Sequence, residues 1–296
     1  YDIASMVPTS LYMLFAGGAL NTVLVPQLVR AVKNDDDDGE AYTNRIMTAF
    51  GLIVAAIALI STLGTPIIVG RIYASDQWLR PEMAAHLESM LFLGYLFLPQ
   101  IFLYGVFFLI GQILNARDHF GPMMWAPVVN NIVQIGVLGI YLWIYGTSDG
   151  AEPFTPAQGL LLGGGATFGI ACQTLVMLLC LRRAGYRYKP RFDLKGTGLG
   201  HTFSLAKWTL GFVLVNQLAL VVVTRLATAA TVDGAGAGIA AYNKAYLIFL
   251  LPHSLVTVSL ATAMLPSASR LAASGDMRGV ARETMRTLRL VTAVLL

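Results

Sequence analysis

The chain reads GQILNARDHFGPMMWAPVVNN from residue 111 to residue 131, and this stretch joins two long apolar runs. The first run, residues 91–114, ends in a polar cluster at residues 115–119, and Gly121 and Pro122 follow just beyond it. A proline cannot continue a preceding helix and restricts the residue before it, so one helix ends here and another begins. Because each run is long enough to cross a bilayer, the stretch predicts a membrane hairpin of two helices.

The composition of the whole chain is typical of a membrane protein. Of its 296 residues, 56% are apolar and only 12% are charged, whereas soluble domains carry about 25% charged residues. The net charge of +4 would also suit nucleic acid, but the cations lie in loops between apolar runs. Membrane topology therefore explains them, and we expect no nucleic-acid partner. The chain begins at Tyr1 and stops inside an apolar run, so we expect a fragment of a longer protein.

Apolar runs of membrane-spanning length recur along the chain. They predict an all-α polytopic transmembrane helix bundle with about eight spans, the last of them truncated. The predicted spans are residues 3–32, 45–69, 84–114, 123–145, 153–181, 202–230, 239–271 and one from about residue 287. The connecting loops are short. We divide the chain into an N-terminal lobe at residues 1–184, a basic cytoplasmic linker at residues 185–200 and the start of a C-terminal lobe at residues 201–296.

The loop cations predict the orientation of the spans. One set of alternate loops holds nearly all of them: Arg30, Lys33, Arg45, Arg117, Arg182, Arg183, Arg187, Lys189, Arg191, Lys195, Arg270, Arg278, Arg282, Arg286 and Arg289. The opposite loops hold Arg71 and Arg80. Since cytoplasmic loops carry the excess of Lys and Arg, the first set is expected to face the cytoplasm.

Three groups of residues, in chain order, resemble the MurJ/MviN family of lipid II flippases. Residues 14–20 with 25–26 (LFAGGAL and VP) are similar to the family's second helix. Residues 112–117, Phe120 and residues 126–131 (QILNAR, F and APVVNN) are similar to the hairpin between its fourth and fifth helices. Residues 264–267 with 272–276 (MLPS and AASGD) are similar to the end of its eighth helix.

The resemblance implies a protein that covers the family's second to early ninth helices. It implies a cavity between two lobes that opens alternately inward and outward, and basic residues there that bind the pyrophosphate of a lipid-linked substrate. The chain departs from the family at positions that carry Arg or Asp in other members, where it has Tyr12, Met13, Tyr246 and Leu247. Lys244, about one helical turn before Leu247, is the residue that would compensate.

Three cations lie within predicted spans: Lys207, Arg225 and Lys244. A charge inside the bilayer is costly, so such a residue usually faces a partner or a hydrated cavity. Lys207 lies near its helix start and is expected to snorkel to the interface. For Arg225, snorkelling and anion binding both stay open, whereas anion binding is favoured for Lys244. No acidic residue lies deep in a span, so we expect no internal ion-pair partner and a shared hydrated cavity in which Arg225 and Lys244 bind an anionic ligand.

Amide side chains also lie at depth: Gln100, Asn130, Asn131, Gln134, Asn216 and Gln217. Hydrogen bonding between helices is the plain interpretation of each. Our candidate substrate-binding residues are therefore Arg225, Lys244, Lys207, Asn216 and Asn130.

The remaining polar motifs indicate no catalysis. We find no metal-ligand spacing and no nucleophile with a base, so we expect neither enzyme activity nor a cofactor. The acidic residues 35–38 are expected to be a solvated loop. The basic stretch 182–195, RRAGYRYKPRFDLK, is expected to anchor the topology, with binding of anionic lipid headgroups as the alternative.

Lipid II flipping is thus the function that the resemblance implies, with a lipid-linked anionic substrate, the bilayer and cell-wall synthesis proteins as partners. The alternatives are another exporter of the same superfamily, for a lipid-linked glycan or a drug, and a non-transporting membrane scaffold for cell-wall synthesis.

Overall fold

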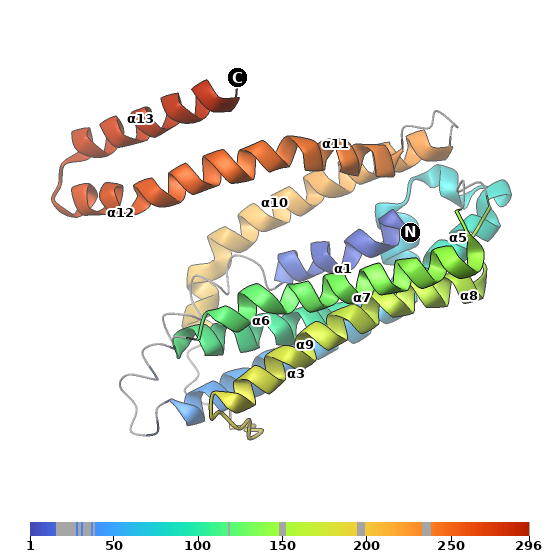
Figure 1. The fold of residues 1–296 in the computed structure, drawn as a ribbon, viewed down its shortest axis with the longest axis horizontal. Coiled ribbons are helices and arrows are strands. Elements are labelled where there is room, and N and C mark those ends of the chain that lie inside the picture. The colour runs from blue at the N-terminus through green and yellow to red at the C-terminus, as the bar shows by residue number, and fades with distance from the viewer. Residues whose placement is uncertain are drawn as a thin grey trace. The chain divides into compact units, whose positions relative to one another are not determined.

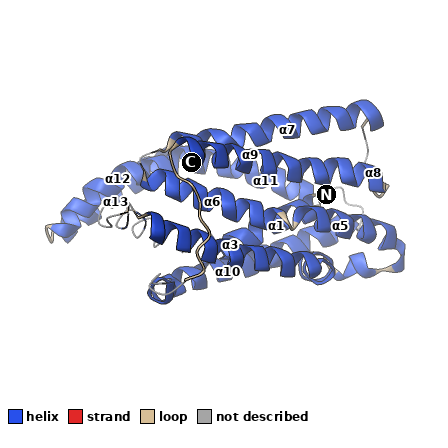
Figure 2. Ribbon diagram, turned by 90° about the horizontal axis from the view of Figure 1, so that it is seen from below, coloured by secondary structure: helices blue, strands red, loops and turns tan. Residues whose placement is uncertain are grey.

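The computed structural model describes residues 1–15, 28, 31, 37, 39–117, 119–147, 152–193, 199–232 and 238–295. In that part of the chain every regular element is a helix, which confirms the predicted all-α class (Figures 1 and 2). Residues 16–20 and 25–26, which carry part of the family resemblance, lie outside the described residues, as do Asp35, Asp36 and Asp38 of the acidic loop.

The chain divides into two compact units, Tyr1–Asp233 and Gly234–Leu296. The helices of the first unit are α1 (Asp2–Phe15), α3 (Glu40–Leu63), α4 (Thr65–Ile67), η1 (Ile68–Tyr73), η2 (Asp76–Leu79), η3 (Pro81–Met83), α5 (Ala84–Phe97), α6 (Gln100–Ala116), α7 (Gly121–Tyr145), α8 (Pro156–Gly159), η4 (Leu160–Gly164), α9 (Gly165–Arg183) and α10 (Leu199–Val232). Those of the second are α11 (Ile239–Pro252), η5 (His253–Val258), α12 (Ser259–Ala273) and α13 (Met277–Leu295). The predicted lobe boundaries at residues 184 and 201 stay a prediction.

Six helical segments among the described residues are long and apolar enough to cross a membrane: Glu40–Leu63, Pro81–Ala116, Gly121–Tyr145, Pro156–Arg183, Gly211–Ala230 and Ile239–Ala261. They confirm the polytopic character. The hairpin begins and ends as expected, since α6 ends at Ala116 and α7 begins at Gly121 with Pro122 in its first turn. Apolar side chains of α7 such as Ile132, Ile135 and Trp143 are exposed, as a surface in contact with lipid requires.

Prolines divide two of the predicted spans. The span at residues 84–114 consists of α5 and α6, separated at Pro99, and the span at residues 239–271 changes to the π-helix η5 directly after Pro252. Proline donates no backbone hydrogen bond, and its ring displaces the preceding turn, so the helix widens or breaks there. Long apolar length alone therefore predicted the spans but not these interruptions.

The predicted span from about residue 287 needs correction. The helix there, α13, already begins at Met277 and carries Arg278, Arg282, Arg286 and Arg289, which we had placed in a loop. Their spacing of three or four residues puts the arginines along one side of the helix. Only the start of this helix and the place of its arginines are corrected, and the truncated span from about residue 287 stays a prediction.

Glycines let the helices of the first unit approach each other closely. A Cβ atom at Gly165 of α9 would lie 2.6 Å from the side chain of Val137 on α7, and one at Gly169 would lie 2.5 Å from Asn130 Oδ1. Figure 1 shows α7 and α9 running side by side. On the adjoining η4, a Cβ at Gly163 would lie 2.9 Å from Leu96 of α5. Small residues at contacts between membrane helices allow this packing.

We expect Gly165→Ala to destabilise the first unit. An added methyl group in a filled contact costs about 1–3 kcal/mol, which outweighs the helix propensity gained by replacing glycine. Gly139→Ala on α7 is the matched control, because no atom lies within 4 Å of its added Cβ. The thermal unfolding midpoint in detergent should fall for Gly165→Ala and stay or rise for Gly139→Ala. Equal midpoints would contradict the packing described here.

Candidate functional site

Arg225, near the end of α10, binds the backbone of a segment that lies far away in the sequence. Its guanidinium donates hydrogen bonds to the carbonyl oxygens of Arg71, Ile72 (3.4 Å) and Ala74 (2.9 Å), and it pairs with the Asp76 carboxylate at 2.7 Å. These carbonyls lie at the C-terminal end of η1, where helical oxygens have no partner within the helix. The planar guanidinium, with its five donors, satisfies several of them at once.

Thr228, one turn further along α10, extends this contact. Its hydroxyl donates to the Arg225 carbonyl (2.9 Å) and accepts from the Ser75 amide (3.2 Å), and its own carbonyl accepts from Trp78 Nε1 (3.2 Å). Thr228 is fully buried. We call Arg225, Thr228 and residues 71–78, which they contact, the α10 tie. It joins one end of α10 to the segment between α4 and η3.

The α10 tie corrects one expectation. We predicted that Arg225 has no internal ion-pair partner because no acidic residue lies deep in a span, and a partner outside the spans was overlooked. Asp76 lies in the loop, and the side chain of Arg225 reaches it from the end of the helix. Whether Arg225 also binds a substrate stays a prediction.

The other predicted cations are not brought together by the described contacts. The side chain of Lys207 on α10 lies outside the described residues. Lys244 on α11 is exposed and belongs to the second unit, whereas Arg225 belongs to the first. The proposed convergence of Arg225 and Lys244 in one cavity therefore stays a prediction. Asn216 on α10 is exposed, and its amide donates to the Phe212 carbonyl of the same helix at 3.0 Å.

Asn130 lies at a contact between helices. On α7 it faces Gly169 of α9, and its Oδ1 atom is buried without a hydrogen-bond partner among the described residues. Gln100 of α6 makes a hydrogen bond between helices, as predicted, because its amide donates to the Thr167 hydroxyl of α9 at 2.8 Å. A substrate-binding role for Asn130 stays a prediction, and its present contacts are those of packing.

Sequence reasoning missed a polar cluster at the opposite end of the first unit. Residues 184–193, which we call the basic strap, leave α9 and dock on α3. The Tyr186 hydroxyl and the Lys189 amide both donate to Asn44 Oδ1, at 2.8 and 2.9 Å. The Arg191 amide donates to the Thr48 hydroxyl at 3.0 Å. The first part of the predicted linker is thus bound to the bundle, and the tyrosines among the cations of YRYK, residues 186–189, are the signal that would have indicated it.

Tyr186 is the centre of the docked strap. It is fully buried, and the Arg117 guanidinium lies over its ring, 4.9 Å from the centroid. Burial raises the pKa of the Tyr186 phenol above its ordinary value, while Arg117 acts in the opposite sense. The ring therefore joins α3, α6 and the strap as a neutral side chain.

Asp193 ends the docked part of the strap. A hydrogen bond from Arg45 holds the pKa of the Asp193 carboxyl below its ordinary value, and the two side chains pair at 2.7 Å. Since the pKa is lowered in the folded state, the pair is complete at neutral pH. Its small contribution to stability is lost as the pH falls through that lowered pKa.

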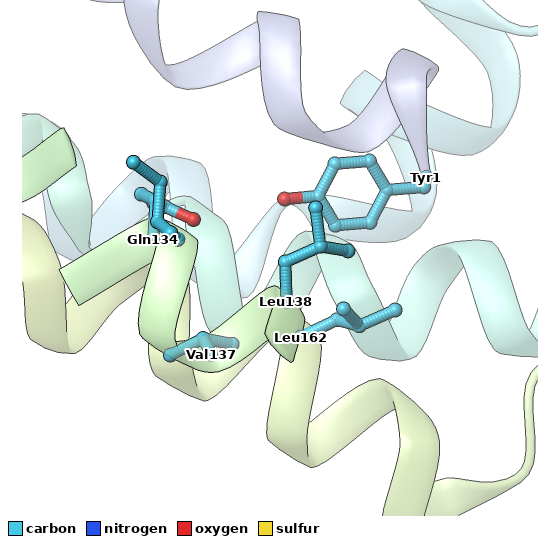
Figure 3. Close-up of a pocket in the computed structure, with 6 residues that line it drawn as sticks. Tyr1, Gln134, Val137, Leu138 and Leu162 are labelled. Atoms are coloured by element: carbon cyan, nitrogen blue, oxygen red, sulfur yellow. The ribbon is translucent and has the colours of Figure 1, made fainter. Parts of the chain in front are cut away.

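A cavity of about 370 Å³ opens on the first unit beside α7 (Figure 3). It is lined by Tyr1, Gln134, Ile135, Val137, Leu138 and Leu162. Figure 3 shows the Tyr1 ring opposite Gln134 and Leu138. This lining is mostly apolar, so the cavity suits a hydrocarbon chain better than a charged headgroup. It contains none of the candidate substrate-binding residues.

Comparison with known proteins gives one consistent family. The family model described as lipid II flippase MurJ matches residues 1–296. A probable lipid II flippase MurJ of Rhizobium tropici is 24% identical over 288 residues, which cover 96% of this chain and 51% of that protein. One of Vibrio cholerae is 26% identical over 296 residues, covering 99% of this chain and 54% of that protein. The chain therefore spans about half the length of these curated relatives.

Proposed function

The chain belongs to the lipid II flippase MurJ family, and from this membership we propose that the full-length protein moves lipid-linked peptidoglycan precursor across the bacterial inner membrane. The match over residues 1–296 carries the proposal, and it agrees with the resemblance described above. Six helices of membrane-spanning length and composition support it. The substrate would pass from the cytoplasmic to the outer leaflet by alternating access, without covalent chemistry on the protein.

The low burial of α10 supports a role for this helix as a moving part of the transporter. In its segment Gly211–Ala230 only 11% of the most apolar window is buried, so most of this helix is not packed into the described part of the protein. The α10 tie holds one end through side-chain hydrogen bonds, and its carboxylate partner Asp76 is 87% exposed. The ion pair between Arg225 and Asp76 can open toward solvent, whereas opening the whole tie also exposes buried Thr228. We assign the α10 tie to the state of the transport cycle in which the outer side of the protein is closed.

The pyrophosphate of the substrate is the group that the cations would bind. Lys207, Lys244 and Arg225 carry charge on α10 and α11, and Asn216 adds an amide to α10. Guanidinium binds phosphate through paired hydrogen bonds, whereas ammonium acts as a point charge. The family's substrate also suggests cell-wall synthesis proteins as partners of the full-length protein.

The orientation that we propose places the basic strap in the cytoplasm and the loop at residue 152 outside. In a Cys172→Ala/Cys180→Ala background, a cysteine at exposed Glu152 should react with an impermeant maleimide in intact spheroplasts. A cysteine at exposed Pro190 should react only after permeabilisation. The reversed pattern would overturn the orientation.

Depletion of the full-length protein tests the proposed function in cells that contain no other family member. We expect lipid-linked precursor to accumulate and the fraction exposed in the outer leaflet to fall, with both restored by re-expression. An unchanged outer-leaflet fraction after depletion would contradict flipping and favour the scaffold alternative.

A further inference from the structure

The basic strap carries three exposed cations. Its odd-numbered residues Arg187, Lys189 and Arg191 have exposed side chains, while Tyr186 is buried and the Tyr188 hydroxyl bonds Thr48 at 2.8 Å. Backbone amides at residues 189 and 191 dock the strap on α3. The outward charges therefore play no part in holding it there.

These cations have no acidic partner in the described part of the chain. The one carboxylate of the strap, on Asp193, forms an ion pair with Arg45. Asp37, the nearest described residue of the acidic loop, accepts hydrogen bonds from the amides of Gly39 and Ala41 at the start of α3. The outward face of the strap is thus positively charged and open to an anion.

The docking site fixes the depth of the strap along α3. The segment Glu40–Leu63, of 24 residues, is long and apolar enough to cross the hydrocarbon layer. Asn44 and Thr48 lie in the first turns of this segment, about 6 and 12 Å along the axis from its first residue, and therefore toward the end that meets the lipid headgroups. The strap folds back to this level because it bonds both residues.

Two aromatic residues of the strap are also exposed, Tyr188 at 43% and Phe192 at 72%. Aromatic side chains beside cations are typical of a surface at the membrane interface, where rings lie among the headgroups and ammonium or guanidinium groups meet phosphate. A purely soluble anion would make no use of an exposed Phe at this depth.

From charge, depth and aromatic exposure together, we propose that the basic strap is a binding surface for anionic phospholipid headgroups of the adjacent leaflet, with Arg187, Lys189 and Arg191 as the phosphate ligands. This surface is separate from the pyrophosphate site proposed for transport. It requires neither flipping nor movement of α10, so its test does not depend on the proposed function.

The test uses full-length protein in neutral detergent, titrated with phosphatidylglycerol or phosphatidylcholine and followed by native mass spectrometry. A Lys189→Gln/Arg191→Gln variant keeps the docking amides and removes two outward charges. The control Arg71→Gln/Arg80→Gln removes the same charge in the opposite loops. Each cation beside an anionic lipid surface contributes about fivefold in binding. We expect the strap variant to lose phosphatidylglycerol affinity by roughly tenfold or more, with equal thermal stability and unchanged phosphatidylcholine binding.

Retention of wild-type phosphatidylglycerol affinity by the strap variant would overturn the proposal, as would an equal loss in the control variant. A third arm adds inorganic pyrophosphate to the wild-type complex. Displacement of the lipid at equimolar pyrophosphate would show a general anion site and would count against a lipid surface. Persistence of the lipid under that competition supports the surface.

Discussion

The Tyr186→Ala variant is expected to unfold at a markedly lower temperature than the wild-type protein. Tyr186 is fully buried, bonds Asn44 and lies beneath Arg117, so its removal leaves a cavity and releases the strap from α3. Replacing a buried aromatic residue by alanine costs about 3–5 kcal/mol. Tyr186→Phe keeps the ring and loses only the hydrogen bond, which contributes about 0.5–1.5 kcal/mol.

The unfolding midpoint in detergent measures both effects. Tyr188→Ala is the comparison variant, because this neighbouring ring is 43% exposed and its removal loses only the hydroxyl contact with Thr48. The expected order of stability is wild type, then Tyr188→Ala and Tyr186→Phe, with Tyr186→Ala clearly lowest. A wild-type midpoint for Tyr186→Ala would show that the docked strap does not contribute to the stability of the first unit.

The Arg225→Ala variant is expected to have the largest effect on transport. A hydrogen bond to a charged group contributes about 1.5–3 kcal/mol, so loss of the guanidinium shifts the equilibrium of the α10 tie toward the open form by roughly tenfold to a hundredfold. A protein that cannot close its outer side cannot complete the cycle. Complementation of depleted cells should fail, and a cysteine at Ser75 should become more reactive toward impermeant maleimide.

Asp76→Asn separates the two roles proposed for Arg225. If the residue acts through the α10 tie, this variant weakens the tie and impairs transport, less severely than Arg225→Ala because the carbonyl contacts of Arg225 remain. If Arg225 serves only as a substrate ligand, loss of Asp76 frees it and transport is unchanged or improved. Arg80→Ala, another exposed cation of the same loop region, is the control and should transport normally.

Much of the fold could be predicted because its signals are local. Gly121 and Pro122 mark the start of α7 at the residue where the structure begins it. Apolar length indicated the spans, because the hydrocarbon thickness sets the number of residues that a helix needs. Pro252 changed the helix type within a span, which the length of an apolar run does not show.

The two polar clusters could not be predicted in the same way, because each depends on long-range contacts. Tyr186 and Asn44 lie 142 residues apart in the sequence, and Arg225 and Asp76 lie 149 apart. Our prediction for Arg225 rested on acidic residues within spans, although a long side chain near a helix end reaches a loop. Asn130 was predicted to bind the substrate because it is an amide side chain deep in a predicted span. Its contact with Gly169 depends on helix packing that a single sequence does not reveal.

The central claim, that the full-length protein moves lipid II between leaflets, is tested most directly with purified protein in liposomes that contain fluorescent lipid II. An impermeant quencher reports the fraction of label in the outer leaflet over time. We predict that the protected fraction decays faster with wild-type protein than in protein-free vesicles, and that Arg225→Ala reduces this acceleration while Arg80→Ala retains it. Decay at the protein-free rate with folded wild-type protein would contradict the account.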